Sequence, residues 1–370
     1  MRIPVRSSSE WVVTGNWGKW CEIRQESGEK VDTLVLDVGV NIARQERGIS
    51  LELSNREETL EIELRQVAAT EEYEYVLPVI FHVLYRVPED DVPVGYLSSC
   101  LERVNELYRD GPVDMNLKFV LATHDPNGQL LEEPGVRREF REELPMDMFD
   151  FVGNKFGDCA WIWDPKEYIN VVIFDSKSIP SGCAHFPYLP ESVVLPGVLF
   201  SDWYADHLPD AHVHCVVWNR SHMFSRYELL GVIFDYDVFT LAHEMGHYLG
   251  LLHPFVDGKG NFGDYCDDTP DYCVNGYETF LSELDETFPY SDDNYRKVIQ
   301  RVALNGRVFI ADNIMDYEFG YLDRFTLEQR KRVRTVLENA WLLPGPKIEV
   351  EPRARSGKKA VKPSAPKPVS

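Results

Sequence analysis

The stretch LAHEMGHYLGLLHPF, residues 241–255, brings three histidines and one glutamate together. His243 and His247 are four residues apart, so on an α-helix both imidazoles lie on one face, one turn apart. Gly250 can adopt a positive φ and end that helix abruptly, which lets the chain turn and bring His253 to the same point. The pattern HExxHxxGxxH therefore predicts one metal site with three imidazole ligands.

Three neutral imidazoles around Zn²⁺ leave a fourth position open to water, whose pKa falls from about 15.7 to about 7 on the metal. Glu244 is the natural general base, because it can take the proton of the attacking water and pass it to the leaving amine. The predicted activity is that of a zinc-dependent endopeptidase, which hydrolyses peptide bonds with a zinc-bound water. Two alternatives are a helix whose histidines are merely tolerated and a structural zinc site, although structural sites usually have four protein ligands.

Strands and helices alternate around this motif. The runs LPVIFHVLY (77–85), LKFVLATHDPNG (117–128) and YINVVIFD (168–175) predict strands. Helices are expected over residues 94–109, from near Asp237 through the motif, and over 326–340, where Thr326 is the N-cap and Gln329 completes a capping box. An α+β fold follows from this pattern. The helix over 94–109 should bury one apolar stripe, consisting of Val94, Leu97, Leu101, Val104 and Leu107.

The two ends of the chain have different compositions. Residues 10–66 alternate polar and apolar side chains in short runs separated by turn signals, which predicts a small β-sandwich. The last residues are rich in Pro, Lys, Ser and Ala, which predicts a disordered basic tail. The expected domains are a β-sandwich module over 1–67, a catalytic domain over 72–345 and the tail over 346–370.

Composition excludes several classes of partner. The chain has 370 residues and a formal net charge of -23, which argues against nucleic acid and anionic membranes as partners. No apolar run reaches the roughly 18 residues of a membrane span, and the first residues lack the apolar core of a signal peptide. Seven cysteines leave at least one thiol unpaired. Cys266 and Cys273 are the most plausible disulfide partners.

The motif is also the metzincin signature, and the chain resembles the pappalysin-like (cytophagalysin, M43) metallopeptidases over about residues 74–342. The resemblance rests on DNIMDYEF, GDYCDDTPDYC and DRFTLEQRKRVR, and upstream on LPVIFHVLY, LATHDPNG, WDPKEYINVVIF and GCAHFP. It implies a zincin-like α+β fold, with a twisted sheet above the cleft, the motif helix beneath it and a smaller lower half. Peptide substrate would lie antiparallel to an exposed sheet edge near residues 182–200.

The resemblance also implies roles for particular residues. Met315 would be the methionine-turn residue that packs under the metal. Tyr317 would either stabilise the transition state near the metal or be a packed aromatic residue. A structural calcium ion is expected close to the site, where hard oxygens are available, unless this is an ordinary acidic surface loop. The calcium candidates are Asp264, Asp267, Asp268 and Thr269.

Two features depart from the family pattern. Relatives that cleave beside Arg or Lys have an acid at the base of the specificity pocket, for which Glu318 and Asp323 are the candidates, with Tyr321 between them. The segment 201–238 matches nothing known in the family. Its histidines are surface residues in the favoured interpretation and a second metal site in the alternative: His207, His212, His214 and His222.

The N-terminal module resembles the later strands of a BACON domain, a small β-sandwich. We expect a further strand and an export or lipoprotein signal upstream of Met1. Trp11 and Trp20 belong either to the sandwich core or to a sugar-binding surface. Cys21 is either a packed thiol or a latency switch. The landmarks of the resemblance are Trp11, Trp20, Asn41, Arg47 and Gln66.

The favoured interpretation is a protease that acts on proteins or peptides and is secreted or held at a bacterial surface. One alternative is a non-catalytic surface protein that binds glycans or proteins on a degenerate zincin scaffold. Retention of Glu244 argues against it, because zinc binding does not require this base. A second alternative is a zinc hydrolase that acts on other amides.

Overall fold

The computed structural model describes residues 1–15, 20–153, 161–207, 214–224, 226–229, 232–257, 263–282, 291–317 and 319–348. The chain divides into two compact units. One unit contains Met1–Tyr73 and the segment that starts at Pro346, and the other contains Glu74–Gly345. Most of the predicted tail, residues 349–370, lies outside the described residues.

The first unit consists of two antiparallel sheets with the strand orders β1-β5-β3 and β4-β2-β6-β7. Both sheets contribute to one core, which includes Trp11, Trp20 and Cys21. The two tryptophan side chains are therefore core residues, the first of the two alternatives drawn from the sequence, and Cys21 is a packed thiol. The first strand was not predicted. The strands are β1 (Arg2–Arg6), β2 (Trp11–Gly15), β3 (Cys21–Ile23), β4 (Ser27–Gly28), β5 (Val31–Val38), β6 (Arg47–Ser54) and β7 (Thr59–Gln66).

The second unit is built on a six-stranded sheet with the order β10-β8-β11-β15-β12, to which β9 adds by pairing with β8. All pairs are parallel except that of β12 with β15, so β12 is an antiparallel edge strand. Every residue of β11 is buried, as expected for a strand covered on both faces. The strands are β8 (Tyr75–Tyr85), β9 (Leu117–Leu121), β10 (Val136–Phe140), β11 (Ile169–Phe174), β12 (Gly182–Ala184) and β15 (Val216–Asn219).

Two helices pack against this sheet, α1 (Val94–Arg109) next to β9 and α3 (Tyr236–Tyr248) next to β12 and β15. The predicted bounds of α1 are confirmed, and its stripe buries Leu97, Leu101 and Val104. Tyr108 rather than Leu107 completes the buried face. The final helix, α6 (Leu327–Asn339), begins at the predicted capping box, in which Thr326 accepts from the Gln329 N–H.

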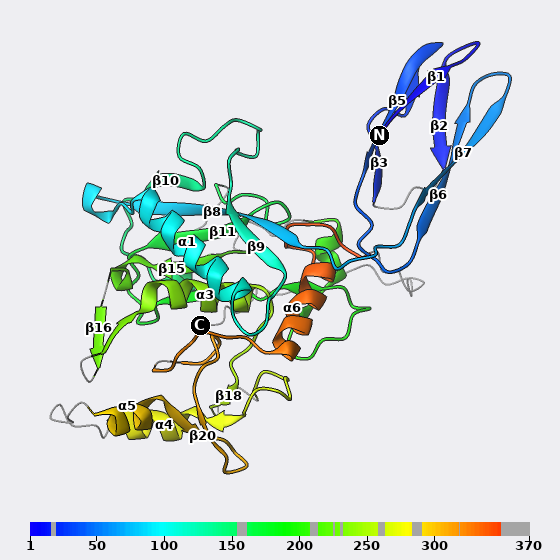
Figure 1. The fold of residues 1–370 in the computed structure, drawn as a ribbon. Helices are drawn as coiled ribbons and strands as arrows, with labels where there is room; N and C mark the ends of the chain where they lie inside the picture. Colours follow the sequence, from blue (N-terminus) through cyan, green and yellow to red (C-terminus); the bar gives the residue numbers. More distant parts are fainter. Residues whose placement is uncertain are drawn as a thin grey trace. The chain divides into compact units, whose positions relative to one another are not determined.

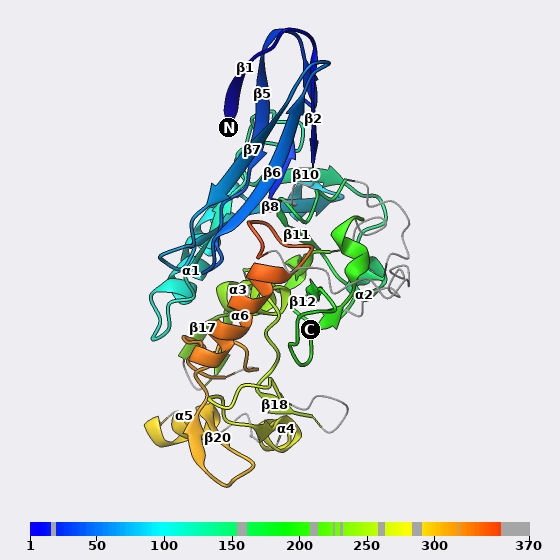
Figure 2. The ribbon, with the colours of Figure 1, turned by 90° about the vertical axis from the view of Figure 1, so that its right-hand side faces the viewer.

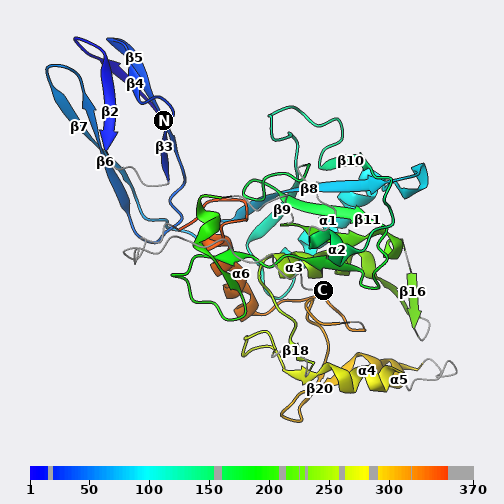
Figure 3. The same ribbon diagram turned by 180° about the vertical axis from the view of Figure 1, so that it is seen from behind.

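A smaller half lies on the other side of α3 from the sheet in all three views (Figures 1, 2 and 3). The predicted α+β architecture, with a sheet above the motif helix and a smaller half below it, is thus confirmed. The lower elements are β18 (Phe255–Val256), β19 (Tyr272–Cys273), α4 (Val274–Ser282), α5 (Asp292–Ile299), β20 (Gln300–Val302) and β21 (Val308–Ile310). The sequence analysis did not predict β10, β12 and β15 of the main sheet. It also missed the short elements α2 (Met148–Val152), β13 (Tyr188–Leu189), β14 (Leu199–Phe200), β16 (Arg226–Leu229) and β17 (Val232–Asp235).

The structure corrects two predictions in this unit. Cys266 is a buried free thiol and Cys273 an exposed one, so the suggested disulfide is not formed. The Sγ atom of Cys266 lies 3.6 Å from the Asp264 carbonyl oxygen, while Cys273 lies on strand β19. His207 and His222 are exposed as predicted, but His214 is buried against Tyr248. His212 lies outside the described residues.

No helix within the described ranges is long and apolar enough to span a membrane.

Candidate metal centre

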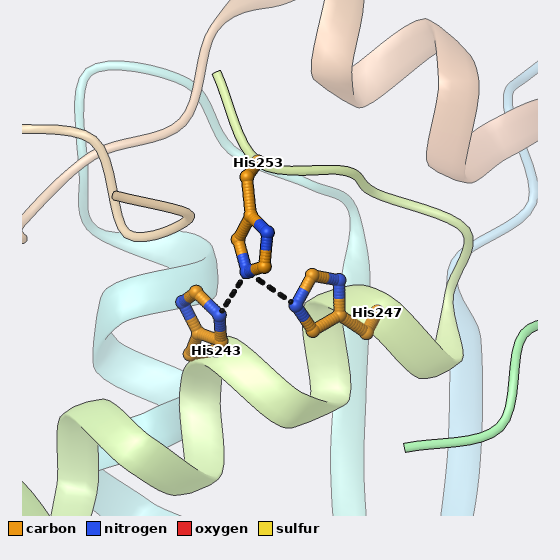
Figure 4. Close-up of side chains that lie close together, drawn as sticks. All are labelled: His243, His247 and His253. Carbon is orange, nitrogen blue, oxygen red and sulfur yellow. Dashed lines mark hydrogen bonds between the residues drawn. The ribbon is translucent and has the colours of Figure 1, made fainter. Parts of the chain in front are cut away.

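Three imidazoles from α3 and the following loop meet at one point (Figure 4). The Nε2 atom of His253 lies 3.1 Å from Nε2 of His243 and 3.0 Å from Nε2 of His247. All three side chains are buried. Within the part of the chain that the structure describes, they are the only group of three or more potential metal ligands placed this closely. The structure thus brings together the three histidines that the sequence singled out.

Backbone carbonyls set the orientation of two of these rings. His243 Nδ1 lies 2.9 Å from the Ile314 carbonyl oxygen, and His247 Nδ1 lies 2.8 Å from that of Leu251. A proton on Nδ1 that is donated to a carbonyl leaves the Nε2 lone pair facing the centre of the cluster. Burial lowers the pKa of His243 to about 4 and holds that of His247 well below its usual range, so both rings are neutral near pH 7.

The turn after α3 is made by Gly250, which has φ +88°. Its N–H donates to the His247 carbonyl, and the next N–H, of Leu251, donates to the Gly246 carbonyl. A Cβ at position 250 would lie 2.7 Å from Val336 Cγ2 of α6. Both the backbone conformation and the space therefore require glycine here, as the sequence predicted from the spacing of the third histidine.

Glu244 lies on the same helix with its side chain buried. Its Oε2 atom has no hydrogen-bond partner among the described residues, and burial raises the pKa of the carboxyl well above its usual range. The edge strand β12 covers this side chain, because a Cβ at Gly182 would lie 2.7 Å from Glu244 Cγ. Sequence reasoning placed Gly182 in a family motif but did not predict this contact.

The methionine turn lies directly under α3. Met315 is fully buried, and its Sδ atom would be 2.3 Å from a Cβ at Gly246. Asn313 holds the turn, since its Oδ1 accepts from the Met315 N–H (2.9 Å) and its amide exchanges two hydrogen bonds with Gln329 of α6. Position 246 therefore requires glycine, because the Met315 sulfur lies where a Cβ would be.

Tyr317 packs into an aromatic cluster beside the histidines, with its ring centroid 4.5 Å from that of His253 and 4.6 Å from that of Phe255. The loop around it is held by Arg301, a buried residue that sequence reasoning missed. Arg301 donates to the carbonyls of Tyr317 (3.2 Å) and Phe319 (2.9 Å), and its guanidinium lies over the Tyr277 ring. An arginine in a short strand carries no sequence signal for such a role.

The acidic residues predicted to bind calcium are used by the protein's own donors. Asp264 Oδ1 accepts from the Thr269 hydroxyl (2.8 Å) and from the Cys266 N–H (3.0 Å). Asp268 caps the start of α6 by accepting from the Glu328 N–H (3.0 Å). No further group of three or more closely placed His, Cys, Asp or Glu ligand atoms is found in the described residues, and the calcium site stays a prediction.

Two acids were candidates for the base of a specificity pocket. One of them, Asp323, has its Oδ1 atom 3.2 Å from Arg324 Nε. Glu318 lies outside the described residues. The neighbouring Tyr321 is exposed.

The donor set fits a zinc ion. The Nε2 atoms of His243 and His247 both lie within hydrogen-bonding distance of His253 Nε2, and among the described residues no cysteine joins this group as a structural site would require. Glu244, the residue after His243 on α3, has a buried carboxylate oxygen to which no described residue donates a hydrogen bond. A cation at the cluster would relieve the repulsion among the lone pairs and favour the charged form of this carboxyl.

Comparisons with known proteins agree with this description. Residues 159–338 match the M43 peptidase family described as Pregnancy-associated plasma protein-A. An extracellular metalloprotease of Verticillium alfalfae is 27% identical over 241 residues, which cover 59% of this chain and 70% of the relative. Mature mirolysin of Tannerella forsythia, solved with a cleaved peptide, is 20% identical with a TM-score of 0.47 and covers 71% of this chain and 92% of its own. A promirolysin mutant from the same organism is 19% identical with a TM-score of 0.49, covering 74% and 84%.

Substituting Gly246 by alanine tests the packing of the methionine turn. The added Cβ collides with Met315, so we expect G246A to lower the free energy of unfolding by about 1–3 kcal/mol in urea titrations. The matched control is G95A, because Gly95 is also helical and its Cβ would meet nothing within 4 Å. This variant should be neutral or more stable by up to about 1 kcal/mol. Equal effects of the two substitutions would contradict the packing.

Proposed function

Residues 159–338 of this chain belong to the pappalysin-like M43 metallopeptidases, and we propose that they hydrolyse internal peptide bonds at the histidine cluster. The chain is a metalloendopeptidase, and its substrates are proteins or peptides. One observation supports this proposal: three imidazole nitrogens meet at one point, and the next residue after His243 on the same helix, Glu244, has a buried oxygen with no hydrogen-bond partner among the described residues. His243, His247 and His253 are the residues we assign to hold the catalytic zinc.

Zinc, when bound, supplies a Lewis acid that polarises a carbonyl and lowers the pKa of water. The protein's own contribution begins with Glu244, which we assign as the general base. Its carboxylate takes a proton from water during attack on the scissile carbonyl and passes it to the leaving nitrogen. Gly182 leaves room for this side chain and supports it from the side of the sheet. The site thereby holds the base with little freedom to turn away.

The edge strand offers a way to orient the substrate. In the described sheet β12 pairs with β15 on one side only, and Gly182 within it contacts Glu244. A peptide that adds to the free side as a further antiparallel strand places its backbone along the base and the histidines. Main-chain hydrogen bonds then provide affinity with little dependence on sequence. The substrate would then lie along residues 182–200, the region predicted from the sequence.

We further assign Tyr317 to stabilising the developing oxyanion, supported by the packing of its ring against His253. Tyr317 can have this role and still be a packed aromatic residue, because only its hydroxyl group would contact the substrate. The similarity to an extracellular metalloprotease supports a secreted protein. The BACON-like identity of the first unit remains a prediction, since the family match begins at residue 159.

The role of Glu244 is tested with E244Q, which keeps the shape of the side chain and removes its basicity. We expect the rate of peptide hydrolysis to fall by about 10²- to 10⁴-fold, the usual contribution of a general base. The zinc content should stay the same, because the histidines are unchanged. The measurement is cleavage of a peptide library followed by mass spectrometry, alongside metal analysis. Retention of wild-type rates by E244Q would rule out this base.

The ligand assignment is tested by metal-dependent stability. Zinc that binds only the folded state raises stability by about 4 kcal/mol at a thousandfold excess over Kd. We expect zinc to raise the Tm of the wild type and of H207A, whose side chain is exposed, as this stabilisation implies. The H253A variant should lose most of it, since one of three ligands is gone. An equal zinc-dependent shift in H253A would contradict the assignment.

The support of the base is tested with G182A. The new Cβ would lie 2.7 Å from Glu244 Cγ and 3.0 Å from the Val217 carbonyl oxygen, so the carboxylate must move. A displacement near 1 Å costs about 10²-fold in rate, and we expect kcat to fall by that order while zinc affinity is kept. G95A again serves as the control. Unchanged kcat in a G182A protein of normal zinc content would refute the support of Glu244 by β12.

A further inference from the structure

A buried arginine on α6 contacts the backbone of the histidine turn. Arg332 is 4% exposed. Its Nε atom donates to the Gly250 carbonyl at 2.6 Å, and Nη2 donates to the Pro196 carbonyl at 2.7 Å. One guanidinium therefore links three segments that are distant in sequence: α6, the turn after α3, and the loop that follows the edge-strand region.

Both carbonyls belong to segments that set the geometry of the histidines. Gly250 lies between His247 and His253, and the carbonyl of the next residue, Leu251, accepts from His247 Nδ1. The loop at Pro196 packs on the same turn, because a Cβ at Gly197 would lie 2.6 Å from Leu252 Cδ1. A shift of the Gly250 carbonyl would thus move one ligand directly and change the hydrogen bond that orients another.

The chemistry of the side chain suits this task. The planar guanidinium presents its N–H groups in a rigid fork, so that one side chain can hold two carbonyls at a fixed separation. The single ammonium of lysine lacks this geometry. Burial lowers the pKa of the Arg332 guanidinium, and the carboxyl of Asp264 opposes this shift. Such a buried cation is costly to place, and here it serves two backbone acceptors.

We propose that Arg332 is a positioning residue for the metal centre, which holds the turn of residues 249–253 so that His247 and His253 meet His243 with the correct geometry. The inference rests on the proposed zinc site. It assigns Arg332 no contact with substrate. Residues that orient metal ligands from behind typically contribute 10- to 100-fold to metal affinity.

The test compares R332M with R334M. Arg334 is a matched control, because it is also buried on α6, where it pairs with Glu338 (3.1 Å) and lies over the Tyr75 ring. We expect both variants to have a lower Tm in the metal-free state. Only R332M should bind zinc about 10- to 100-fold more weakly in competition with a chromophoric chelator, and only R332M should change the visible absorption spectrum of the cobalt-substituted protein.

The variant R332K settles the case in which R332M does not fold. It keeps the charge and loses the fork, so we expect zinc affinity to remain at least several-fold below that of the wild type. Wild-type zinc affinity together with an unchanged cobalt spectrum in R332M or R332K would overturn the proposal, as would an equal change in R334M. Failure of the proposed function has a different signature, in which the wild type itself shows no zinc binding that depends on His253.

Discussion

The structure depends on bringing three imidazole lone pairs to one point. Burial denies these nitrogen atoms water, so the backbone must hold the arrangement, and a bound cation would compensate the repulsion among the lone pairs. His243 and His247 meet this requirement through helical spacing and through hydrogen bonds from Nδ1 to the carbonyls of Ile314 and Leu251. His253 meets it only because the chain reverses at Gly250.

Holding that turn requires elements from across the unit. Helix α6 supplies Val336 against Gly250 and Gln329 to the methionine turn, while β12 covers Glu244 from the sheet. The contacts share one feature, namely that a glycine lies where a neighbouring element comes closest. Gly182, Gly246 and Gly250 each have an atom of another segment within 3 Å of the Cβ that they lack. The metal centre is therefore built by close packing of backbone as much as by its ligands.

The polar residues around the centre serve the same purpose. Asp264, a calcium candidate in the sequence, accepts from Thr269 and Cys266, and burial raises its pKa to about 6. Arg301 holds the carbonyls of the loop that carries Tyr317. An acidic loop and a basic side chain that appear to be surface features in the sequence thus act as internal supports, because tertiary contacts supply donors and acceptors that composition does not reveal.

The sequence by itself determined the histidine pair, its glutamate, the glycine turn and the third histidine, since these follow from the helical period and from the conformational freedom of glycine within fifteen residues. The helix over 94–109, three of the six strands of the main sheet (β8, β9 and β11) and the capping box of α6 could also be predicted, because they are local patterns. Only the tertiary structure decided that His214 is buried, that Cys266 and Cys273 stay apart, and that Arg332 reaches Gly250. Such contacts join residues more than eighty positions apart or depend on which face a neighbour covers, and no periodicity along the chain encodes them.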